Sequence, residues 1–448
     1  MKRLFGTDGI RGVAGEAPLD PSTARKFGRA LAEVIERPPG RAATVVLGRD
    51  TRESGPWLRD AVVAGLRSRG AEATDAGVIT TPGLAHVTRS RRFDAGVMIS
   101  ASHNPFRDNG LKVFAADGTK LPDEQESEVE ERILHAGFDD PGPVCGVAAV
   151  EDGALVRDYV RHLEEAVSPP GSLRGMRLVL DCANGAATGI APEVFRHHGA
   201  EVETVGAAPD GRNINLDCGS LHLDSLARHV QAGSFDLGIA FDGDADRALA
   251  VDRRGRIVDG DYILYLAARR LHREGRLDGD LVVGTVMSNF WLERRLAADG
   301  IRLLRAPVGD KYVLERMVDE GAVLGGEQSG HIIFLRHFPT GDGILTGLLL
   351  ADTLRRGTVL ESVLDEIRPL PQVLLNVRVR EKPDLRAHPI IGPVVADAER
   401  TLSSEGRIVL RYSGTEPVAR VMVEGADSAV VNREAERLVA VIRAELGC

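Results

Sequence analysis

A run of alternating carboxylates is the first part of the chain that could perform chemistry. The segment FDGDADR places Asp242, Asp244 and Asp246 at every second position, directly after the apolar run LGIA. Carboxylates this close repel one another unless a hard cation neutralises them, and an all-oxygen set favours Mg²⁺, Mn²⁺ or Ca²⁺ over zinc. A solvated acidic turn is the simpler alternative, but this triplet follows a predicted buried strand. An EF-hand does not fit, because Arg247 and Arg253 stand where that loop needs Gly and Glu.

The segment ISASHNP, residues 99–105, contains a serine that could act as a nucleophile. It continues an apolar run and then breaks into a polar turn at the point where we expect the strand to reach the surface. A simple turn is one interpretation, because Ser and Asn bond their own backbone and Pro ends ladder pairing. The other is that Ser102, next to His103, is displayed because it reacts. Lys112 stands close enough in sequence to fold back on it, although a lone lysine is usually a solvated surface residue.

Two further loops have the composition of anion and sugar sites. RYSGTEP offers Arg411, Ser413, Thr415 and the backbone N–H groups around Gly414, with Arg420 on the next predicted strand. Such a loop is typical of an anion nest with an arginine clamp, although an ordinary Ser-Gly turn is the alternative.

The second of these loops, GGEQSGH, suits sugar hydroxyls. It carries Glu327, Ser329 and His331 between glycines, which let the backbone approach a ligand closely. A histidine alone is more often structural than functional. Arg247, directly after the carboxylates, is suited to a phosphate near the metal.

Composition excludes several classes of function. Of the 448 residues, 43% are hydrophobic and 27% charged, which is ordinary for a globular protein, and the net charge of -10 gives no support for binding nucleic acid or a membrane surface. Four scattered cysteines predict reduced thiols, and the start of the chain has no signal-peptide core, so we expect a cytoplasmic protein. Only six of the 56 basic residues are lysines, so each retained lysine is informative: they are Lys2, Lys26, Lys112, Lys120, Lys311 and Lys382.

The strand-like runs repeat three times along the chain. Units beginning near residues 44, 178 and 281 each read as strand, Gly-rich loop, helix, strand, loop, helix, strand and polar loop. Apolar runs between helical patterns predict parallel or mixed sheets covered on both faces, and ligands bind beyond the carboxyl ends of such strands. We therefore expect an α/β fold of three similar domains with mixed sheets and a smaller C-terminal α+β domain. The predicted limits are 1–145 for the catalytic domain, 146–254 for the metal-binding domain, 255–368 for the sugar-binding domain and 369–448 for the phosphate-binding domain.

The motifs ISASHNP, FDGDADR, GEQSGH and RYSGTEP, in this order, resemble those of the α-D-phosphohexomutase superfamily, and the resemblance covers nearly the whole chain. It implies four domains around a central cleft and a phosphoryl transfer in which Ser102 is a phosphoserine. It further implies that Mg²⁺ binds Asp242, Asp244, Asp246 and phospho-Ser102, and that a sugar 1,6-bisphosphate forms and turns over in the cleft. The roles implied for the remaining residues are proton transfer and local charge for Lys112 and His103, assisted by Arg11 and Arg247, and substrate binding by Glu327, Ser329, His331, Lys311, Arg411, Ser413, Gly414, Thr415 and Arg420.

The sequences of several loops resemble those of the amino-sugar members of the superfamily. GEQSGH, together with GTVMSN, GDKYV and PDGRNIN, carries this finer resemblance. It implies interconversion of glucosamine 6-phosphate and glucosamine 1-phosphate through glucosamine 1,6-bisphosphate, for cell-wall precursor synthesis, with small sugar phosphates as partners and a possible homodimer. Two alternatives stay open: a phosphomannomutase/phosphoglucomutase of the same superfamily, and a sugar-phosphate binding protein without catalysis.

Overall fold

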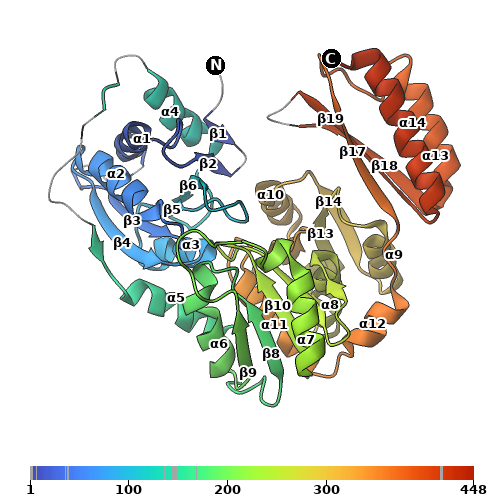
Figure 1. The fold of residues 1–448 in the computed structure, drawn as a ribbon, viewed down its shortest axis with the longest axis horizontal. Coiled ribbons are helices and arrows are strands. Elements are labelled where there is room, and N and C mark those ends of the chain that lie inside the picture. The colour runs from blue at the N-terminus through green and yellow to red at the C-terminus, as the bar shows by residue number, and fades with distance from the viewer. Residues whose placement is uncertain are drawn as a thin grey trace.

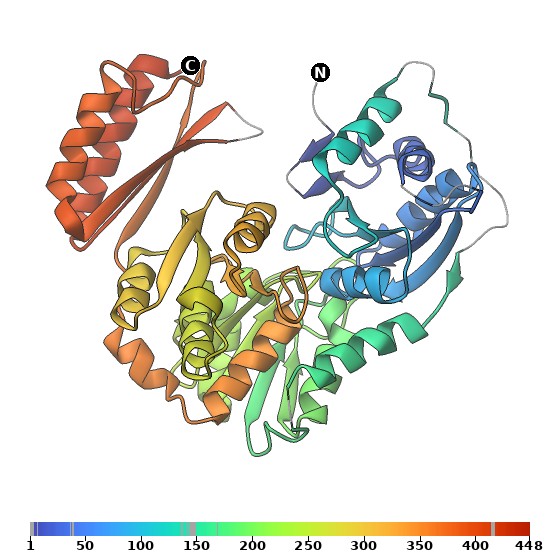
Figure 2. The ribbon, with the colours of Figure 1, turned by 180° about the vertical axis from the view of Figure 1, so that it is seen from behind.

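The computed structural model describes residues 4–6, 8–35, 37, 40–135, 138–140, 142, 149–167, 169–413 and 417–448. Four bodies follow one another along an arc, with the N-terminal body at one end and the C-terminal body at the other (Figures 1 and 2). Each body contains one sheet, as the sequence predicts.

The first body has a seven-stranded sheet in the order β1-β2-β6-β5-β3-β4-β7. Helices cover both faces of this sheet (Figure 1). The strands are β1 (Phe5–Gly6), β2 (Gly9–Val13), β3 (Thr44–Arg49), β4 (Glu72–Val78), β5 (Ala95–Ile99), β6 (Asp108–Ala115) and β7 (Val150–Glu151), and the helices are α1 (Pro21–Val34), α2 (Gly55–Arg67), α3 (Thr81–Ser90) and α4 (Asp123–Leu134).

The second body has a five-stranded sheet in the order β12-β11-β10-β8-β9. Its strands are β8 (Arg177–Asp181), β9 (Glu201–Val205), β10 (Leu237–Phe241), β11 (Ala248–Asp252) and β12 (Ile257–Val258). Helix α5 (Ala154–Glu165) leads into it, followed by α6 (Ala191–His197), α7 (Leu223–Gly233) and the short 3-10 helices at Ala186–Gly189 and Gly219–Leu221.

The third body has a four-stranded sheet in the order β14-β13-β15-β16. Its strands are β13 (Leu281–Thr285), β14 (Arg302–Ala306), β15 (Leu324–Gly326) and β16 (Ile332–Phe334). Its helices are α8 (Gly260–Arg273), α9 (Phe290–Ala298), α10 (Asp310–Glu320), α11 (Gly343–Arg355) and α12 (Leu360–Glu366), with a 3-10 turn at Asp278–Asp280.

The three sheets share one topological unit, which confirms the predicted repeat. In each, three parallel strands are followed by an antiparallel strand: β4-β3-β5-β6, β9-β8-β10-β11 and β14-β13-β15-β16. The loop between the last two strands of each unit carries one of the predicted functional motifs. Equivalent positions in three similar folds thus present the serine, the carboxylates and the sugar loop.

The fourth body is a smaller α+β unit with the strand order β17-β19-β18. Its strands are β17 (Gln372–Arg378), β18 (Gly406–Tyr412) and β19 (Val418–Gly425), with helices α13 (Ile391–Leu402) and α14 (Ser428–Leu446) and a 3-10 turn at Ser403–Glu405. Asp427 caps α14 through hydrogen bonds from Ala429 and Val430, and the helix packs on the sheet by an apolar stripe.

The cores divide the molecule unevenly. One hydrophobic cluster runs from α3 and α5 through the second sheet into α8 and α11, so it joins the first three bodies, whereas the fourth has a cluster of its own. The exact limits between the bodies stay a prediction. Two short strands pair across the predicted limits: β7 lies after residue 145 but pairs with β4 of the first sheet, and β12 lies after residue 254 but pairs with β11 of the second. None of the helices in the described part of the chain has the length and apolar character needed to cross a membrane.

Candidate active site

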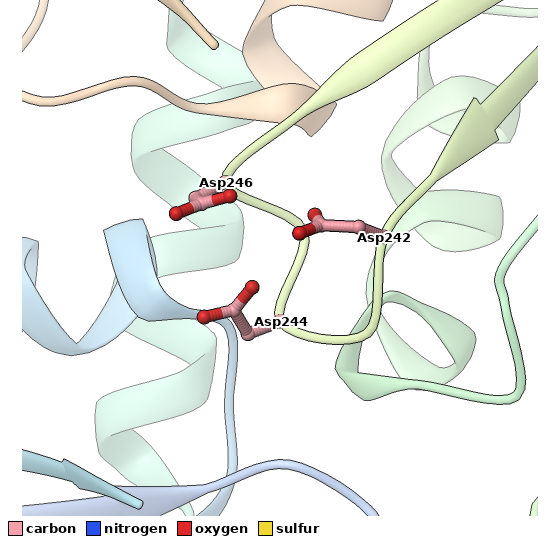
Figure 3. A group of neighbouring side chains, drawn as sticks. All are labelled: Asp242, Asp244 and Asp246. Carbon is pink, nitrogen blue, oxygen red and sulfur yellow. The ribbon is translucent and has the colours of Figure 1, made fainter. Parts of the chain in front are cut away.

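The three predicted carboxylates lie together in the loop between β10 and β11. Asp242, Asp244 and Asp246 point toward a common space (Figure 3), and one oxygen from each lies within 4.8 Å of the others. All three are buried, and one oxygen each of Asp244 and Asp246 has no hydrogen-bond partner. Buried carboxylates with unsatisfied oxygens are what a hard divalent cation requires, so the residues present fit such an ion.

The protein environment treats two of these carboxylates in opposite ways. Burial raises the pKa of Asp242 well above its usual range, and the charges of Asp246 and Asp244 raise it further. Burial also acts to raise the pKa of Asp244, but the Lys112 ammonium and a hydrogen bond from the Thr81 hydroxyl outweigh it and hold that pKa below its usual value. The repulsion between the carboxylates therefore raises the pKa of Asp242, whereas the pKa of Asp244 stays low.

Ser102 lies against this cluster, but the structure corrects one expectation about it. The serine was expected to be displayed at the surface, and it is only 1% exposed. The carboxylate loop of the second body covers it, and the Ser102 hydroxyl donates a hydrogen bond of 2.5 Å to Oδ2 of Asp242. The expected exposure of Ser102 was wrong because the segment around it does not show that a loop from another body covers it.

The backbone of the serine loop is held in an unusual conformation. Ser102 has a φ of 53°, in the left-handed region that costs a non-glycine residue about 1–2 kcal/mol. Its carbonyl accepts hydrogen bonds of 2.9 Å from both Arg52 and Asn215, and its N–H donates to the Ser100 hydroxyl. Ser100 and Arg52 in turn both donate to Asp50. These bonds fix the direction in which the Ser102 hydroxyl points.

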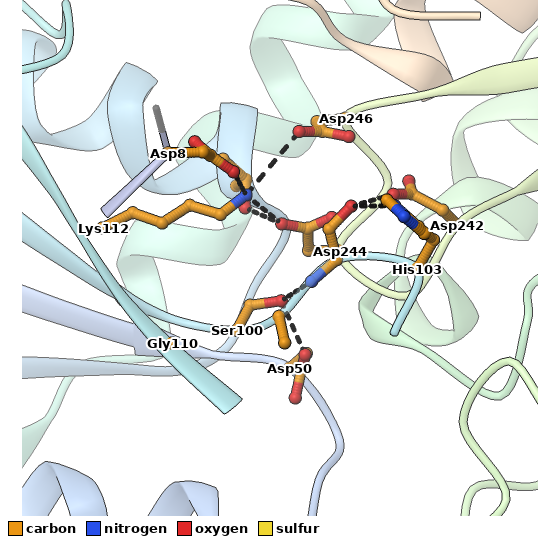
Figure 4. Close-up of polar contacts among 12 residues, drawn as sticks. Asp8, Asp50, Ser100, His103, Gly110, Lys112, Asp242, Asp244 and Asp246 are labelled. Carbon is orange, nitrogen blue, oxygen red and sulfur yellow. Dashed lines mark hydrogen bonds and ion pairs between the residues drawn. The ribbon is translucent and has the colours of Figure 1, made fainter. Parts of the chain in front are cut away.

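Lys112 reaches the cluster from β6, which pairs with β5 and so runs back past the serine. Its ammonium reaches Asp244, Asp8 and Asp246 (Figure 4), at 2.9 Å, 3.0 Å and 3.7 Å. The residue is 2% exposed. The interpretation as a solvated surface lysine is therefore excluded. Arg11, the other predicted cation of this body, forms an ion pair with Asp8.

His103 is within reach of the serine hydroxyl. Its Nδ1 lies 3.3 Å from Ser102 Oγ. Burial lowers the pKa of His103 to about 4, and the positive charges of Arg247 and Arg11 act in the same direction. The imidazole is therefore neutral near pH 7 and can accept a proton.

The sugar loop of the third body meets the carboxylate loop through His331. His331 Nε2 accepts a hydrogen bond from the Gly341 N–H, so its Nδ1 carries the proton, and Nδ1 lies 3.7 Å from Asp246. Glu327 accepts a hydrogen bond from the Gly309 N–H at the start of α10, while Ser329 is exposed. This loop and the carboxylates thus belong to one site.

Two further predicted cations lie at the edge of this region. The backbone N–H of Arg247 donates to Asp242, and its guanidinium lies 3.7 Å from Asp246. Lys311 pairs with Asp123 of the first body and lies 3.9 Å from Glu315 on its own helix. It borders a cavity of about 510 Å³ that His331 also lines.

The predicted phosphate-binding residues stand on the fourth body, at the far end of the arc (Figure 1). Arg411 belongs to β18 rather than to a loop, and it pairs in register with Arg420 on β19. Burial lowers the pKa of Arg411, and the charge of the neighbouring Arg420 lowers it further. Ser413 is buried and its carbonyl accepts a hydrogen bond from Lys382, while Gly414 and Thr415 lie outside the described residues.

The fourth body contacts the loop that follows β13. Glu424, which is fully buried, accepts a hydrogen bond of 2.6 Å from the Phe290 N–H and another from Arg407. Arg407 also donates to the carbonyls of Val286 and Ser288. Since this body has a separate core, these polar contacts set its position relative to the third.

Several residues of the site were missed in the sequence. Asp50, Arg52 and Asn215 support the serine loop, and their roles depend on contacts with residues 50 or more positions away in the sequence. Asp8 and Asp310 were also missed, although Asp310 stands in GDKYV, one of the motifs of the finer resemblance. The scarcity of lysine pointed to Lys120 without showing its partners.

Four domain descriptions from one family match the chain in order. Phosphoglucomutase/phosphomannomutase alpha/beta/alpha domain I matches residues 2–140, domain II matches 157–255, domain III matches 259–370 and the C-terminal domain matches 374–441. The chain belongs to the phosphoglucomutase/phosphomannomutase family. Its fold of three α/β domains and a C-terminal domain is the phosphohexomutase fold.

Full-length relatives narrow the assignment. The phosphoglucosamine mutase of Solibacter usitatus is 48% identical over 100% of this chain and 99% of its own. That of Symbiobacterium thermophilum is 48% identical and that of Deinococcus radiodurans 47%, again over 98% or more of both chains. A phosphoglucomutase/phosphomannomutase family protein of Burkholderia thailandensis has a similar structure, with a TM-score of 0.79, 26% identity and full coverage of both chains.

A more distant structure shares the fold alone. It is the N-acetylphosphoglucosamine mutase of Aspergillus fumigatus in complex with GlcNAc-6P and magnesium, with a TM-score of 0.68 and 19% identity over 99% of this chain and 96% of that one. The full-length relatives and the family match identify the chain as an isomerase that interconverts glucosamine 6-phosphate and glucosamine 1-phosphate. The phosphomannomutase alternative is not favoured.

Proposed function

We propose that this mutase activity runs through a phosphorylated Ser102 and a glucosamine 1,6-bisphosphate intermediate. The single observation that carries the proposal is the 2.5 Å hydrogen bond from Ser102 Oγ to Asp242, which joins the only predicted nucleophile to the carboxylate cluster. Phospho-Ser102 gives its phosphoryl group to the free hydroxyl of the sugar phosphate, which forms the bisphosphate. The bisphosphate then reverses its orientation in the cleft and returns its other phosphoryl group to Ser102.

Asp242, Asp244 and Asp246 would hold Mg²⁺ in this proposal, next to the phosphate on Ser102. The support is their unsatisfied buried oxygens, together with the magnesium named for the Aspergillus fumigatus relative. A bound magnesium ion supplies charge neutralisation for the phosphoryl group and for the serine oxygen that it leaves.

The remaining residues position charge and protons around the transfer. His103 is placed to exchange a proton with the Ser102 hydroxyl, because its neutral Nδ1 is 3.3 Å away. Lys112 and Arg11 supply fixed positive charge from the first body, and Arg247 supplies it from the second. Phosphoryl transfer depends mainly on such positioning and charge neutralisation.

The sugar and the phosphate that does not react are held by the other two bodies. We assign Glu327, Ser329, His331 and Lys311 to the sugar, and Arg411, Ser413, Gly414, Thr415 and Arg420 to that phosphate. The paired Arg411 and Arg420 support this assignment, because two adjacent guanidinium groups fit a phosphate dianion. A fourth body with its own core can move enough to let the bisphosphate turn over.

A coupled assay tests the proposal as a whole. The enzyme is given glucosamine 6-phosphate, Mg²⁺ and a catalytic amount of glucosamine 1,6-bisphosphate, and glucosamine 1-phosphate is measured. We expect turnover that needs the bisphosphate at the start. A folded enzyme that binds the sugar phosphate without turning it over would instead be a binding protein.

Substrate selectivity should be partial. Glucosamine, glucose and mannose phosphates differ mainly at C2, where one polar group replaces another, and discrimination is steep only where a buried partner is left unpaired. We expect kcat/KM for glucosamine phosphates to exceed that for glucose and mannose phosphates by about 10- to 100-fold. A panel of the three sugars with the same activator measures this, and faster turnover of mannose phosphate would contradict it.

The polar contacts between the fourth body and the loop after β13 should affect how well the enzyme retains the bisphosphate intermediate. Arg407→Met removes the contacts to Glu424, Val286 and Ser288. We expect the KM for the sugar phosphate and the concentration of bisphosphate needed for full activity to rise about 10-fold, because a loosened body lets the intermediate escape. Both quantities are measured by steady-state kinetics.

A matched variant separates this effect from loss of folding. Arg437→Met breaks contacts to Asp397 and Glu434 within the fourth body only, and it should leave the bisphosphate requirement unchanged. Because Arg407→Met leaves Glu424 buried without its charge partner, Arg407→Met/Glu424→Gln is the variant to use if the single change unfolds the protein. An unchanged KM and bisphosphate requirement in a folded variant would show that the Arg407 contacts do not help to retain the intermediate.

A further inference from the structure

We propose that Lys120 is a positioning residue that locks the first and third bodies together across the site and so aligns Lys112 with the sugar loop. The inference rests on the proposed function, and it concerns a residue outside every motif that defines the family resemblance. Lys120 follows β6 in a turn of the first body and faces α10 of the third.

The ammonium of Lys120 lies between two carboxylates from different bodies. It is 2.7 Å from Oδ1 of Asp8 in the first body, and 2.8 Å and 2.7 Å from the two oxygens of Asp310 in the third. Burial acts to lower the pKa of Lys120, but the charges of Asp310 and Asp8 outweigh it and raise the pKa, so the amine stays charged. One point charge thus joins two bodies.

Each of these carboxylates also contacts a residue of the site. Asp8 uses its other oxygen to bind Lys112, at 3.0 Å, and pairs with Arg11. Asp310 is a close neighbour of His331, the histidine of the sugar loop: its carboxylate lies 3.8 Å from Nε2 without a hydrogen bond to it, because Nε2 accepts the Gly341 N–H. Lys120 therefore acts on both the serine side and the sugar side of the site through one intermediate carboxylate each.

The contacts close into a ring. Lys120, Asp8, Lys112, Asp246, His331 and Asp310 follow one another with separations of 2.7 to 3.8 Å. Lys112 contributes to this ring from β6 and Asp246 from the carboxylate loop (Figure 4), so the ring includes all three of the first bodies.

The sequence supports a need for lysine at this position. The chain uses arginine for nearly all its cations, and only six of its 56 basic residues are lysines. Four of the six, Lys112, Lys120, Lys311 and Lys382, lie in the site or contact its predicted phosphate loop. An ammonium is a compact point charge, whereas a guanidinium is a wide planar fork that does not fit between two carboxylates both within 2.8 Å of one nitrogen.

Loss of the ammonium should leave Asp8 and Asp310 facing each other as like charges. Their repulsion would push the start of the first body away from α10 and draw Asp8 toward Lys112 and Arg11. A displacement of about 1 Å in a positioned group can cost on the order of 100-fold in rate. The expected result for Lys120→Met is thus a fall in kcat/KM of about 100-fold, mostly in kcat, with phosphorylation of Ser102 by the bisphosphate still detectable.

A double variant separates positioning from folding. In Lys120→Met/Asp310→Asn the repulsion is removed, so thermal stability should return toward the wild-type value while kcat stays low, because nothing joins the two bodies. Lys120→Arg should recover only part of the rate. Lys26→Met, on α1 and outside the site, is the matched lysine control and should behave as wild type.

The test measures kcat, KM, melting temperature and Ser102 phosphorylation for these variants beside the wild type. Wild-type rates in Lys120→Met would overturn the inference, as would a double variant that recovers rate and stability together, since Lys120 would then be structural only. Failure of the proposed function looks different: the wild type itself would show no turnover of glucosamine phosphate.

Discussion

Replacing Ser102 with alanine should abolish mutase turnover while leaving the protein folded. The hydroxyl is the group that the proposal phosphorylates, and loss of a covalent nucleophile lowers kcat by at least about 10⁴-fold in comparable enzymes. The cost in stability should be about 1 kcal/mol, since one hydrogen bond to Asp242 is lost. The coupled assay measures the first quantity and thermal unfolding the second.

Ser100 is the matched control for this variant. It lies two residues away, but its hydroxyl donates to Asp50 and accepts the N–H of Ser102, so it supports the loop and cannot replace the nucleophile. We expect Ser100→Ala to lower the rate and still accept phosphate on Ser102. Activity of Ser102→Ala close to the wild-type value would rule out the covalent mechanism.

Removing the metal should stop turnover, and the carboxylate variants should then separate in stability. We expect EDTA to abolish activity and Mg²⁺ to restore it in the wild type but not in Asp242→Asn or Asp244→Asn. Without metal at pH 7, Asp242→Asn should be as stable as the wild type or more stable, because burial and the charges of Asp246 and Asp244 make ionised Asp242 unfavourable. Asp244→Asn should be less stable, because Asp244 pairs with Lys112 and Thr81.

The sign of the pH dependence follows from these shifts. The pKa of Asp242 is raised on folding, so its contribution to stability is present at low pH and is lost as the pH rises through the folded-state value. The advantage of Asp242→Asn over the wild type should therefore grow from acidic to neutral pH in the metal-free protein. Full activity after exhaustive chelation would mean that the trio is only an acidic turn.

The repeat and the motifs could be predicted because they are local. Apolar runs alternate with helical patterns on a fixed scale, and each predicted strand, such as β10 before the carboxylates, ends where a polar loop begins. These features depend on neighbours within a few residues, which the sequence displays directly.

The closed form of the site could not be predicted, because it depends on packing between bodies. Asp242 and Asn215 of the second body both contact Ser102, which is buried. Likewise, nothing in the turn around Lys120 indicates that Asp310, which is 190 residues away, supplies its partner. The strand position of Arg411 was missed for a related reason: its pairing with Arg420 is set by the register of the whole hairpin.

The most direct test of the central claim is to locate the phosphate. The enzyme is incubated with glucosamine 1,6-bisphosphate labelled in its phosphates, and the intact mass and labelled peptide are determined by mass spectrometry. The account predicts one phosphoryl group per chain, carried on Ser102, and its transfer to added glucosamine 6-phosphate at a rate that matches turnover. Steady turnover by an enzyme that carries no phosphate, or carries it on another residue, would contradict it.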